Sequence, residues 1–258
     1  MTLITKDFST GYEKNKIIKS ISLSLEKSEW LGIVGANGSG KSTFLKGISR
    51  ILDAYTGIAY LDGNDIHHAS TKEIAKKISV LPQQNSSSLS LTVYELVCLG
   101  RSPHKQWWEL DLDENDHFEV EKSIALTDMT SLKNKPVYSL SGGQRQRAFL
   151  SLALAQDAKT LLLDEPTTFL DLRYQLQFLD LLKRLNNEQE LSIVTVIHDL
   201  NLAARYCDRI AVIKDGELLA IDKPREVLTQ ELLKKAFQVE TCQIETPIGL
   251  QICTIKSD

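Results

Sequence analysis

Alternating apolar and polar residues mark the first part of the chain. The stretch IIKSISLSL, from Ile17 to Leu25, has the period of two that is typical of a half-buried strand. The apolar run WLGIVG, which begins at Trp30, indicates a buried strand, and a helix is predicted from Lys41 to about Ile51. GIAYLDGND then predicts a strand and a turn, and AKKISVLP predicts the end of a helix followed by a strand.

The pattern changes between residues 85 and 156. Helical spacing of apolar residues runs through TVYELVCLGR, HFEVEKSIAL and GGQRQRAFLSLALAQ, with no convincing strand. The serine run NSSSLS, from Asn85 to Ser90, is typical of a flexible joint. We therefore predict a helical insert, with the serine run at its junction with the rest of the chain.

The alternation of strands and helices returns after the insert. TLLLDEP predicts a buried strand, residues from Leu172 to about Asn187 an amphipathic helix, and LSIVTVIH another strand. RIAVIKDGELLAI predicts a hairpin, TQELLKKAF a helix, and residues 241–258 a closing hairpin around Pro247 and Gly249. Such alternation predicts an α/β fold with a mostly parallel sheet covered on both faces. The leucines expected on one face of the amphipathic helix are Leu172, Leu176, Leu179, Leu182 and Leu185.

Composition and charge narrow the function classes. The 258 residues, 42% hydrophobic and 25% charged, are typical of a globular protein with one or two domains. A net charge of -4 disfavours nucleic-acid binding through bulk electrostatics. The start MTLITKDFST lacks a signal-peptide pattern, and no stretch approaches the ~18 apolar residues of a membrane span. Because the chain has no such span, we expect it to reach a membrane only through a partner. The four cysteines lack CxxC spacing, so we expect reduced thiols.

The strongest chemical signal is GANGSGKST, which matches G-x-x-x-x-G-K-[ST] between a predicted strand and a predicted helix. Its glycines allow backbone N–H groups to surround phosphate oxygens, and the helix N-terminus adds partial positive charge. Lys41 is expected to neutralise the β- and γ-phosphates, and the Ser42 hydroxyl to bind Mg²⁺. The pattern alone leaves open kinases, GTPases and motors. The predicted nucleotide contacts are Gly35, Ala36, Asn37, Gly38, Ser39, Gly40, Lys41, Ser42 and Thr43.

Two acidic residues end the predicted strand of TLLLDEP. Asp164 is expected to hold Mg²⁺, and Glu165 to orient and activate the water that attacks the γ-phosphate. A solvated acid at a strand end is the plain alternative for Glu165. Beside Asp164 and a phosphate loop, the catalytic interpretation is favoured.

Together these motifs resemble those of one family. GANGSGKST, VLPQQ, LSGGQ, LLLDEP, TTFLD and a strand-terminal His198 stand in the order and spacing of an ATP-binding cassette (ABC) ATPase, from about Leu3 to about Ala236. LSGGQ is the most diagnostic motif, because other P-loop enzymes lack it. The resemblance implies an α/β P-loop NTPase core with a mostly parallel sheet, an N-terminal antiparallel β subdomain and a helical insert. The single domain would comprise a core (1–84 and 157–240), an insert with the signature motif (85–156) and a C-terminal hairpin (241–258).

In this family, the LSGGQ turn of one subunit reaches the nucleotide held by another. The resemblance therefore implies that two copies of the chain close over two ATP molecules and reopen after hydrolysis. Each site would join the phosphate loop of one copy to the signature turn of the other. A plain helix cap, with Ser141 as N-cap, is the alternative. The implied contacts in trans are Ser141, Gly142, Gly143 and Gln144.

Further site residues follow from the same resemblance. His198 resembles the switch histidine that contacts the γ-phosphate and supports the catalytic glutamate. Gln83 resembles the lid glutamine that meets Mg²⁺ and water, with Gln84 as the alternative, and Asp171 resembles the acid that communicates across the dimer. Tyr12 is placed like the aromatic residue that stacks on adenine, although a tyrosine packing at a strand end is also consistent. The histidines that match no motif and are expected to be solvated are His67, His68, His104 and His117.

The segment LTVYELVCLGRSPH, from Leu91 to His104, resembles the ATPases of importers for ferric siderophores, haem and cobalamin. In that class, the insert and the lid-glutamine segment form a groove that receives a cytoplasmic helix of a membrane permease. The implied cofactors are ATP and Mg²⁺, and the implied partners are the permease, a second copy of the chain and a substrate-binding protein, but no nucleic acid. The chain is then expected at the cytoplasmic face of the cell (inner) membrane. An ABC exporter subunit or a non-transport ABC ATPase is the alternative.

Overall fold

The chain folds into two compact units. One unit contains the residues up to Ala69 together with those from Ser192 onwards, and the other runs from Ser70 to Leu191. In the described part of the chain, no helix combines the length and the apolar character that a membrane crossing requires. The structure is a computed structural model that describes residues 2–82, 90–106, 109, 111–247 and 249–257.

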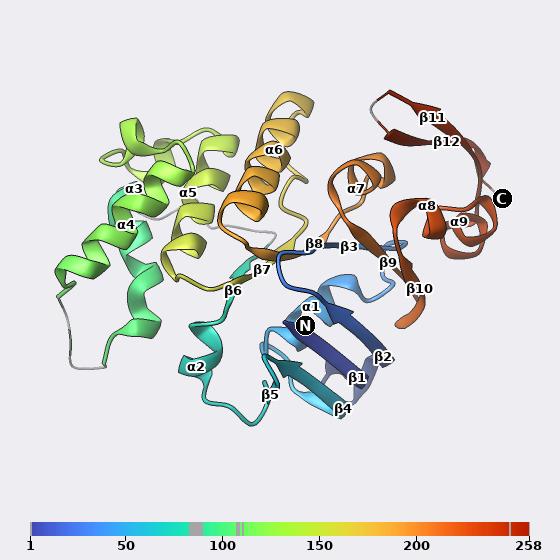
Figure 1. The fold of residues 1–258 in the computed structure, drawn as a ribbon, viewed down its shortest axis with the longest axis horizontal. Helices are drawn as coiled ribbons and strands as arrows, with labels where there is room; N and C mark the ends of the chain where they lie inside the picture. Colours follow the sequence, from blue (N-terminus) through green and yellow to red (C-terminus); the bar gives the residue numbers. More distant parts are fainter. Residues whose placement is uncertain (1, 83–89, 107–108, 110, 248, 258) are drawn as a thin grey trace. The chain divides into compact units, whose positions relative to one another are not determined.

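An antiparallel sheet near the N-terminus belongs to the first unit (Figure 1, blue to cyan). The predicted strand from Ile17 to Leu25 is confirmed as part of β2. Ile21, Leu23 and Leu25 are buried, and the residues between them are more exposed, as alternation along a pleated strand requires. In the spatial order β2-β1-β4-β5, the strands are Asn15–Leu25, Leu3–Tyr12, Ala54–Leu61 and Asn64–Asp65.

A second set of strands in this unit carries the phosphate loop. β3 is parallel to both β8 and β9, and every residue of β3 and β8 is buried, as expected of strands covered on both faces. The β9–β10 turn has left-handed backbone at Asp215 and Gly216 (φ 49° and 81°), which confirms the predicted hairpin. In the spatial order β10-β9-β3-β8, the strands are Glu217–Asp222, Arg209–Lys214, Trp30–Val34 and Ser192–Val196.

The two helices predicted in this unit are confirmed with shorter bounds, and the sequence pattern did not predict two further short helices among the unit's described residues. The helix after the phosphate loop ends at Ile48 rather than Ile51, because Arg50 takes left-handed backbone (φ 63°). The closing hairpin is confirmed, and its strands are β11 (Val239–Thr246) and β12 (Gly249–Ser257). The helices are α1 (Lys41–Ile48), α7 (Leu200–Tyr206), α8 (Pro224–Val227) and α9 (Gln230–Phe237).

The second unit contains two parallel strands, β6 (Ile78–Leu81) and β7 (Thr160–Asp164). Between residues 90 and 156, the described residues form helices and no strand beyond one isolated bridge, as the predicted insert requires. The insert has its own core, which includes Val97, Val120 and Ile124. The α-helices are α2 (Thr71–Ala75), α3 (Val93–Cys98), α4 (Glu114–Leu126), α5 (Gly142–Ala155) and α6 (Leu172–Glu188). The 3-10 helices are η1 (Leu99–His104), η2 (Thr130–Leu132) and η3 (Val137–Ser139).

The α/β fold with an antiparallel N-terminal subdomain and a helical insert is therefore confirmed. The residue boundaries assigned to core and insert stay a prediction. One packing detail is wrong: Leu172 was expected on the buried face of α6, but it is 69% exposed. It opens the helix, whose first three residues are all exposed, and the buried face starts farther along at Phe178.

Two histidines also differ from expectation. His67 is half-buried, and its ring stacks on Phe8 with centroids 5.7 Å apart. His104 is half-buried as well, with its Nε2 atom 2.9 Å from the carbonyl oxygen of Gln156. His68 and His117 are exposed, as expected.

Candidate functional site

The phosphate loop joins β3 to α1 and forms a closed cradle. Gly38 and Gly40 have left-handed backbone (φ 78° and 100°), which favours glycine, and Gly40 is the N-cap of α1. At Gly35, an added Cβ would lie 2.1 Å from the carbonyl oxygen of Ile213, so a side chain does not fit. The loop therefore packs closely against β9, and it leads into a helix N-terminus, which suits an anion.

Lys41 points into this cradle. Its side chain donates hydrogen bonds to the carbonyl oxygens of Gly35 and Ala36, at 2.9 and 3.0 Å, and the residue is only 5% exposed. The Ser39 hydroxyl is also buried, and no hydrogen-bond partner for it is found among the described residues. An ammonium group inside a loop of this shape suits a polyphosphate, because phosphate oxygens accept the hydrogen bonds that the loop carbonyls now receive.

Tyr12 and His198 belong to the same unit as the cradle. Tyr12 ends β1, is 43% exposed, and its hydroxyl accepts a hydrogen bond from Lys46 Nζ at 3.2 Å. The Lys46 ammonium also lies 5.8 Å from the centre of the tyrosine ring. His198 is exposed and lies two residues beyond the end of β8, directly before Asp199, the N-cap of α7. It therefore stands on a connection rather than within the strand itself.

The two acidic residues belong to the other unit. Asp164 ends β7 and is 7% exposed. Glu165 has left-handed backbone (φ 50°), which is uncommon for a residue with a side chain and is often found at functional sites. The Thr168 hydroxyl donates to Glu165 Oε2 at 3.1 Å. The sequence alone did not identify Thr168 as a partner of Glu165. The only signal for this contact is that Thr168 follows Glu165 by three residues, within one turn.

The signature turn opens α5 in the same unit. Ser141 is the N-cap, its hydroxyl accepts from the N–H of Gln144 at 3.3 Å, and Gln144 Oε1 accepts from the N–H of Ser141 at 3.1 Å. This capping box stabilises the start of the helix. Ser141 and Gly142 are exposed. The cap that was considered as the plain alternative is therefore present, and it leaves the exposed face of the turn available for a partner.

Asp171 caps a neighbouring helix of this unit. Its carboxylate accepts a hydrogen bond from the N–H of Tyr174 at 3.1 Å, at the start of α6. The ring of Tyr174 lies over the signature turn, because a Cβ added at Gly143 would be 3.1 Å from Tyr174 Cδ1. Phe169, two residues before Asp171, is 74% exposed. The signature turn and the TTFLD segment thus meet around Tyr174.

The two units divide the predicted site residues between them. The phosphate loop, Tyr12 and His198 lie in the first unit, and Asp164, Glu165, Asp171 and the signature turn lie in the second. Gln83 and its alternative Gln84 lie outside the described residues. The individual roles assigned to these residues stay predictions.

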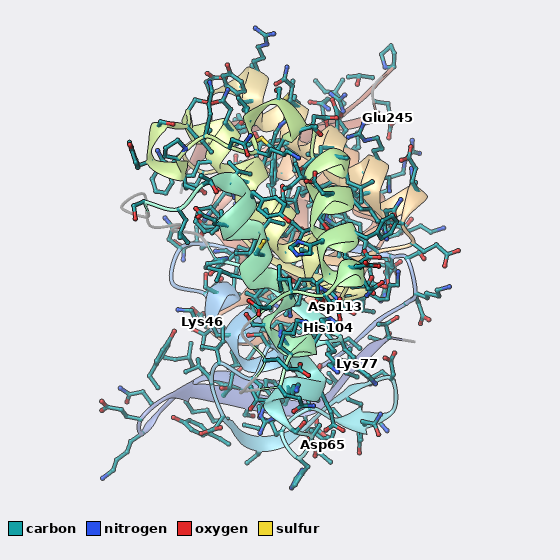
Figure 2. The ribbon with its side chains drawn as sticks, turned by 90° about the vertical axis from the view of Figure 1, so that its left-hand side faces the viewer. Lys46, Asp65, Lys77, His104, Asp113 and Glu245 are labelled. Carbon is teal, nitrogen blue, oxygen red and sulfur yellow. The ribbon has the colours of Figure 1, made fainter. Side chains whose placement is uncertain are left out.

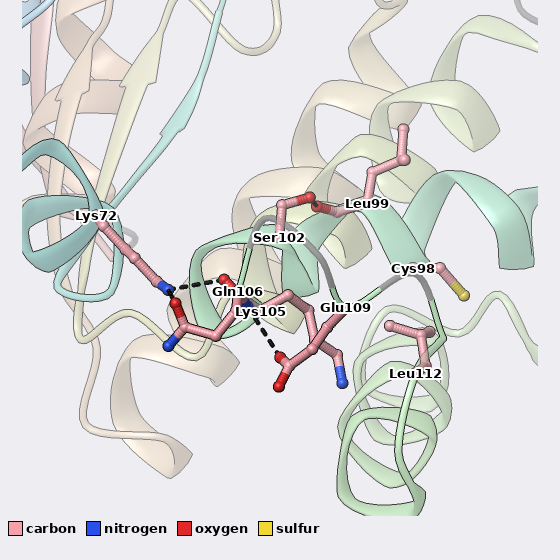
Figure 3. Close-up of a pocket in the computed structure, with 8 residues that line it drawn as sticks. All are labelled: Lys72, Cys98, Leu99, Ser102, Lys105, Gln106, Glu109 and Leu112. Carbon is pink, nitrogen blue, oxygen red and sulfur yellow. Dashed lines mark hydrogen bonds between the residues drawn. The ribbon is translucent and has the colours of Figure 1, made fainter.

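A pocket of about 640 Å³ lies in the second unit, between α2 and the start of the insert (Figure 3). Cys98, Leu99 and Leu112 supply apolar surface, and Lys72 reaches across from α2 to the carbonyl oxygen of Lys105 at 2.7 Å. The remaining lining residues are polar or charged: Ser102, Lys105, Gln106 and Glu109.

A buried ion pair holds the segment beside this pocket. Arg101 donates to Asp116 Oδ1 at 2.8 Å and to the carbonyl oxygen of Ala155 at 2.7 Å, while Lys105 also contacts Asp116. Burial alone would raise the pKa of Asp116, but hydrogen bonds from Lys105 and Arg101 outweigh it and hold the pKa well below its usual range. His104, labelled in Figure 2, adds the contact with Gln156. The LGRSPH segment is therefore fixed against α4 and α5.

Comparison with known proteins decides the family. The ABC transporter family model matches residues 18–168. The chain belongs to the ABC transporter family. It is 42% identical to the petrobactin import ATP-binding protein FpuD of Bacillus anthracis over 253 residues, which cover 97% of this chain and 92% of that protein. As predicted from the motifs, it is the ATPase domain of an ABC transporter.

Solved structures of ABC transporters share its fold. One chain, from an inward-facing conformation of a "metal-chelate type ABC transporter", matches with a TM-score of 0.84 at 25% identity, covering 98% of this chain and 96% of that one. A second is the ATP-binding cassette MJ0796, in a dimeric post-hydrolysis state bound to ADP and Pi. It matches with a TM-score of 0.72 at 31% identity, covering 86% and 99%.

Proposed function

We propose that this ABC ATPase drives the import of a ferric siderophore through a membrane permease. The observation that carries the proposal is the closed cradle around Lys41, in a chain 42% identical to a petrobactin import ATP-binding protein. The cradle supports ATP binding, and the relatedness over 97% of the chain supports a role in transport. The resemblance of the segment from Leu91 to His104 to importer ATPases supports the same direction of transport.

The residues of the chain divide the chemistry between them. Lys41 and the loop N–H groups bind the β- and γ-phosphates, and Tyr12 stacks on the adenine ring. By the motif resemblance, Ser42, Asp164 and Gln83 would hold Mg²⁺, and the ion would supply positive charge for the phosphates. Glu165 accepts a hydrogen bond from the attacking water and orients it, and His198 supports this arrangement at the γ-phosphate. Thr168 holds the Glu165 carboxylate by the hydrogen bond already described.

A second copy of the chain completes each site. The exposed Ser141 hydroxyl and the N–H groups at the start of α5 bind the γ-phosphate held by the partner's cradle, and Asp171 communicates between the two sites. Exposed apolar residues beside this turn, Phe169 and Leu172, favour contact with a protein surface. The dimeric, ADP-bound relative supports this arrangement.

The permease docks in the pocket beside the LGRSPH segment. The apolar floor at Cys98, Leu99 and Leu112 suits the apolar face of a short helix, and the charged rim suits its polar ends. The buried Arg101–Asp116 pair holds this surface against α4. Docking would hold the chain at the cytoplasmic face of the cell (inner) membrane, with a substrate-binding protein as a further component of the system.

Uptake by a strain that lacks this chain tests the proposal. Wild-type chain should restore uptake of at least one of a panel of radiolabelled ferric siderophores, whereas Glu165→Gln should bind ATP and restore none. A strain that regains only haem or cobalamin uptake would contradict the substrate class. Full siderophore uptake with Glu165→Gln would contradict the catalytic assignment.

A further inference from the structure

The closing hairpin of the chain is fastened to the helix that follows His198. Asn201 lies in the first turn of α7, three residues after His198. Its Oδ1 accepts from the N–H of Ile252 at 2.6 Å, and its Nδ2 donates to the carbonyl oxygen of Ile252 at 3.3 Å. One side-chain amide therefore satisfies both backbone groups of a residue in β12.

The contact between α7 and β12 is also packed. Leu250 and Ile252 are 8% and 6% exposed, and they turn one face of β12 toward the unit's interior. The next residue on that face, Thr254, is exposed. The buried part of β12 is therefore the part that contacts α7. The two hydrogen bonds between Asn201 and Ile252 lie within this contact.

Hydrogen bonds also hold the backbone directly before and directly after His198. Ile197 donates its N–H to the carbonyl oxygen of Ile33 in β3 at 3.1 Å, and it is 5% exposed. On the helix side, the Asp199 carboxylate accepts from the N–H groups of Asn201 and Leu202 at 2.8 and 3.0 Å. His198 is therefore the single residue between the anchored Ile197 and Asp199, the N-cap of α7.

We propose that the C-terminal hairpin is a clamp on α7, and that Asn201 is a positioning residue for His198 during ATP hydrolysis. This inference rests on the proposed role of His198. Because His198 is held between two anchors, its direction depends on the path of α7, and Asn201 ties that path to β12. The hairpin thus contributes to catalysis without touching the nucleotide.

Removal of the amide has a specific expected effect. Asn201→Ala leaves the N–H and the carbonyl of Ile252 without their side-chain partner and frees the start of α7 to shift. In the assembled transporter, kcat for ATP should fall about tenfold, while KM for ATP stays within about twofold, because small misplacements of a catalytic group reduce turnover more than binding. Asn201→Asp keeps the acceptor for the Ile252 N–H and should lose less.

A matched control is available in the other unit. Asn186 is 2% exposed and donates through Nδ2 to the carbonyl oxygen of Leu191 at 2.7 Å, so it makes the same type of bond within the unit that does not contain His198. Asn186→Ala should lower the thermal midpoint as Asn201→Ala does. It should leave the local environment of His198 unchanged.

Histidine NMR on the full chain separates positioning from general destabilisation. With labelled histidine and His198→Ala to assign the signal, Asn201→Ala should shift the His198 ring resonances, whereas Asn186→Ala should not. An unshifted His198 signal and unchanged kcat in Asn201→Ala would overturn the clamp. A shifted signal with unchanged kcat would overturn the catalytic part of the inference.

The same measurements keep the two proposals distinct. Wild-type turnover in His198→Ala would remove His198 from the proposed mechanism, whatever the NMR result. If Asn201→Ala fails to fold, Asn201→Asp takes its place. An unshifted His198 resonance together with wild-type kcat in that variant would also overturn the clamp.

Discussion

Two small-residue turns lead into helices in this ABC ATPase, and they are built differently. In the phosphate loop, a Cβ added at Gly35 would lie 2.1 Å from the carbonyl oxygen of Ile213, and Gly40 requires left-handed backbone. In the signature turn, the nearest atom to a Cβ added at Gly142 is Leu170 Cδ2, at 3.8 Å, among the described residues of its unit. Gly35 is therefore crowded by its own chain and Gly142 has room, although Gly143 in the signature turn lies close to Tyr174.

The difference shows where each glycine is required. Gly35 is demanded by the fold of the loop itself, which closes around Lys41. Gly142 is exposed, and its own unit would accept a methyl group there. Any requirement for glycine at Gly142 would therefore have to arise outside its own unit, and the proposed partner nucleotide would supply one.

The largest effect should come from emptying the closed cradle. Lys41→Met keeps the aliphatic stem but removes the ammonium group, and ATP affinity of the isolated chain should fall about 300-fold, or roughly 3.4 kcal/mol. Ser141→Ala, in the open turn, should leave this affinity unchanged. Calorimetric titration of both variants checks the contrast, and equal losses would contradict it.

Adding a methyl group at Gly35 should be nearly as costly to the fold. Gly35→Ala forces the loop away from Ile213, so the free energy of unfolding should drop by about 2–3 kcal/mol. Denaturant unfolding of the isolated chain measures this loss. An unchanged midpoint would show that the cradle is looser than the close approach indicates.

The same change in the open turn should act on activity alone. Gly142→Ala should alter the unfolding free energy by less than about 1 kcal/mol, because Ala fits the first position of α5 and favours helix. ATP turnover of the assembled transporter should nevertheless fall about tenfold, since the methyl group would face the partner's nucleotide. Normal turnover in this variant would place the signature turn outside the site.

The smallest effect concerns the acid stability of the cradle's unit. Burial lowers the pKa of His67, and Asp65 and Asp53 oppose this only in part. Unfolded chain therefore binds more protons below about pH 6.5, and stability is lost as the pH falls from there toward the folded-state pKa. His67→Gln should flatten unfolding curves measured between about pH 7.5 and 5.5 by less than about 1 kcal/mol. An equally steep loss in His67→Gln would assign the dependence to other groups.

The local elements that carry the predicted site residues were readable from the sequence, while long-range packing was not. Lys41, Asp164 and Ser141 stand in contiguous motifs whose spacing carries their chemistry, and the structure places each on the expected element. Asn201 carries no such signal, because its partner Ile252 lies 51 residues away. Helical periodicity likewise led to the wrong prediction that Leu172 is buried. The spacing of apolar residues does not show where neighbouring elements stop covering a helix.

Transporters assembled from two different variants of this chain test most directly whether the signature turn acts in trans. In a transporter with two copies of the chain, one copy carries Lys41→Met, so only the other copy keeps an intact phosphate loop. Ser141→Arg is then placed either on the copy that carries Lys41→Met or on the copy with the intact loop. Vanadate trapping of labelled nucleotide at the intact cradle should be lost when both changes share one chain, because that chain lends its turn to the intact cradle. Trapping should persist when the changes are split between chains. The reverse pattern would contradict the shared site.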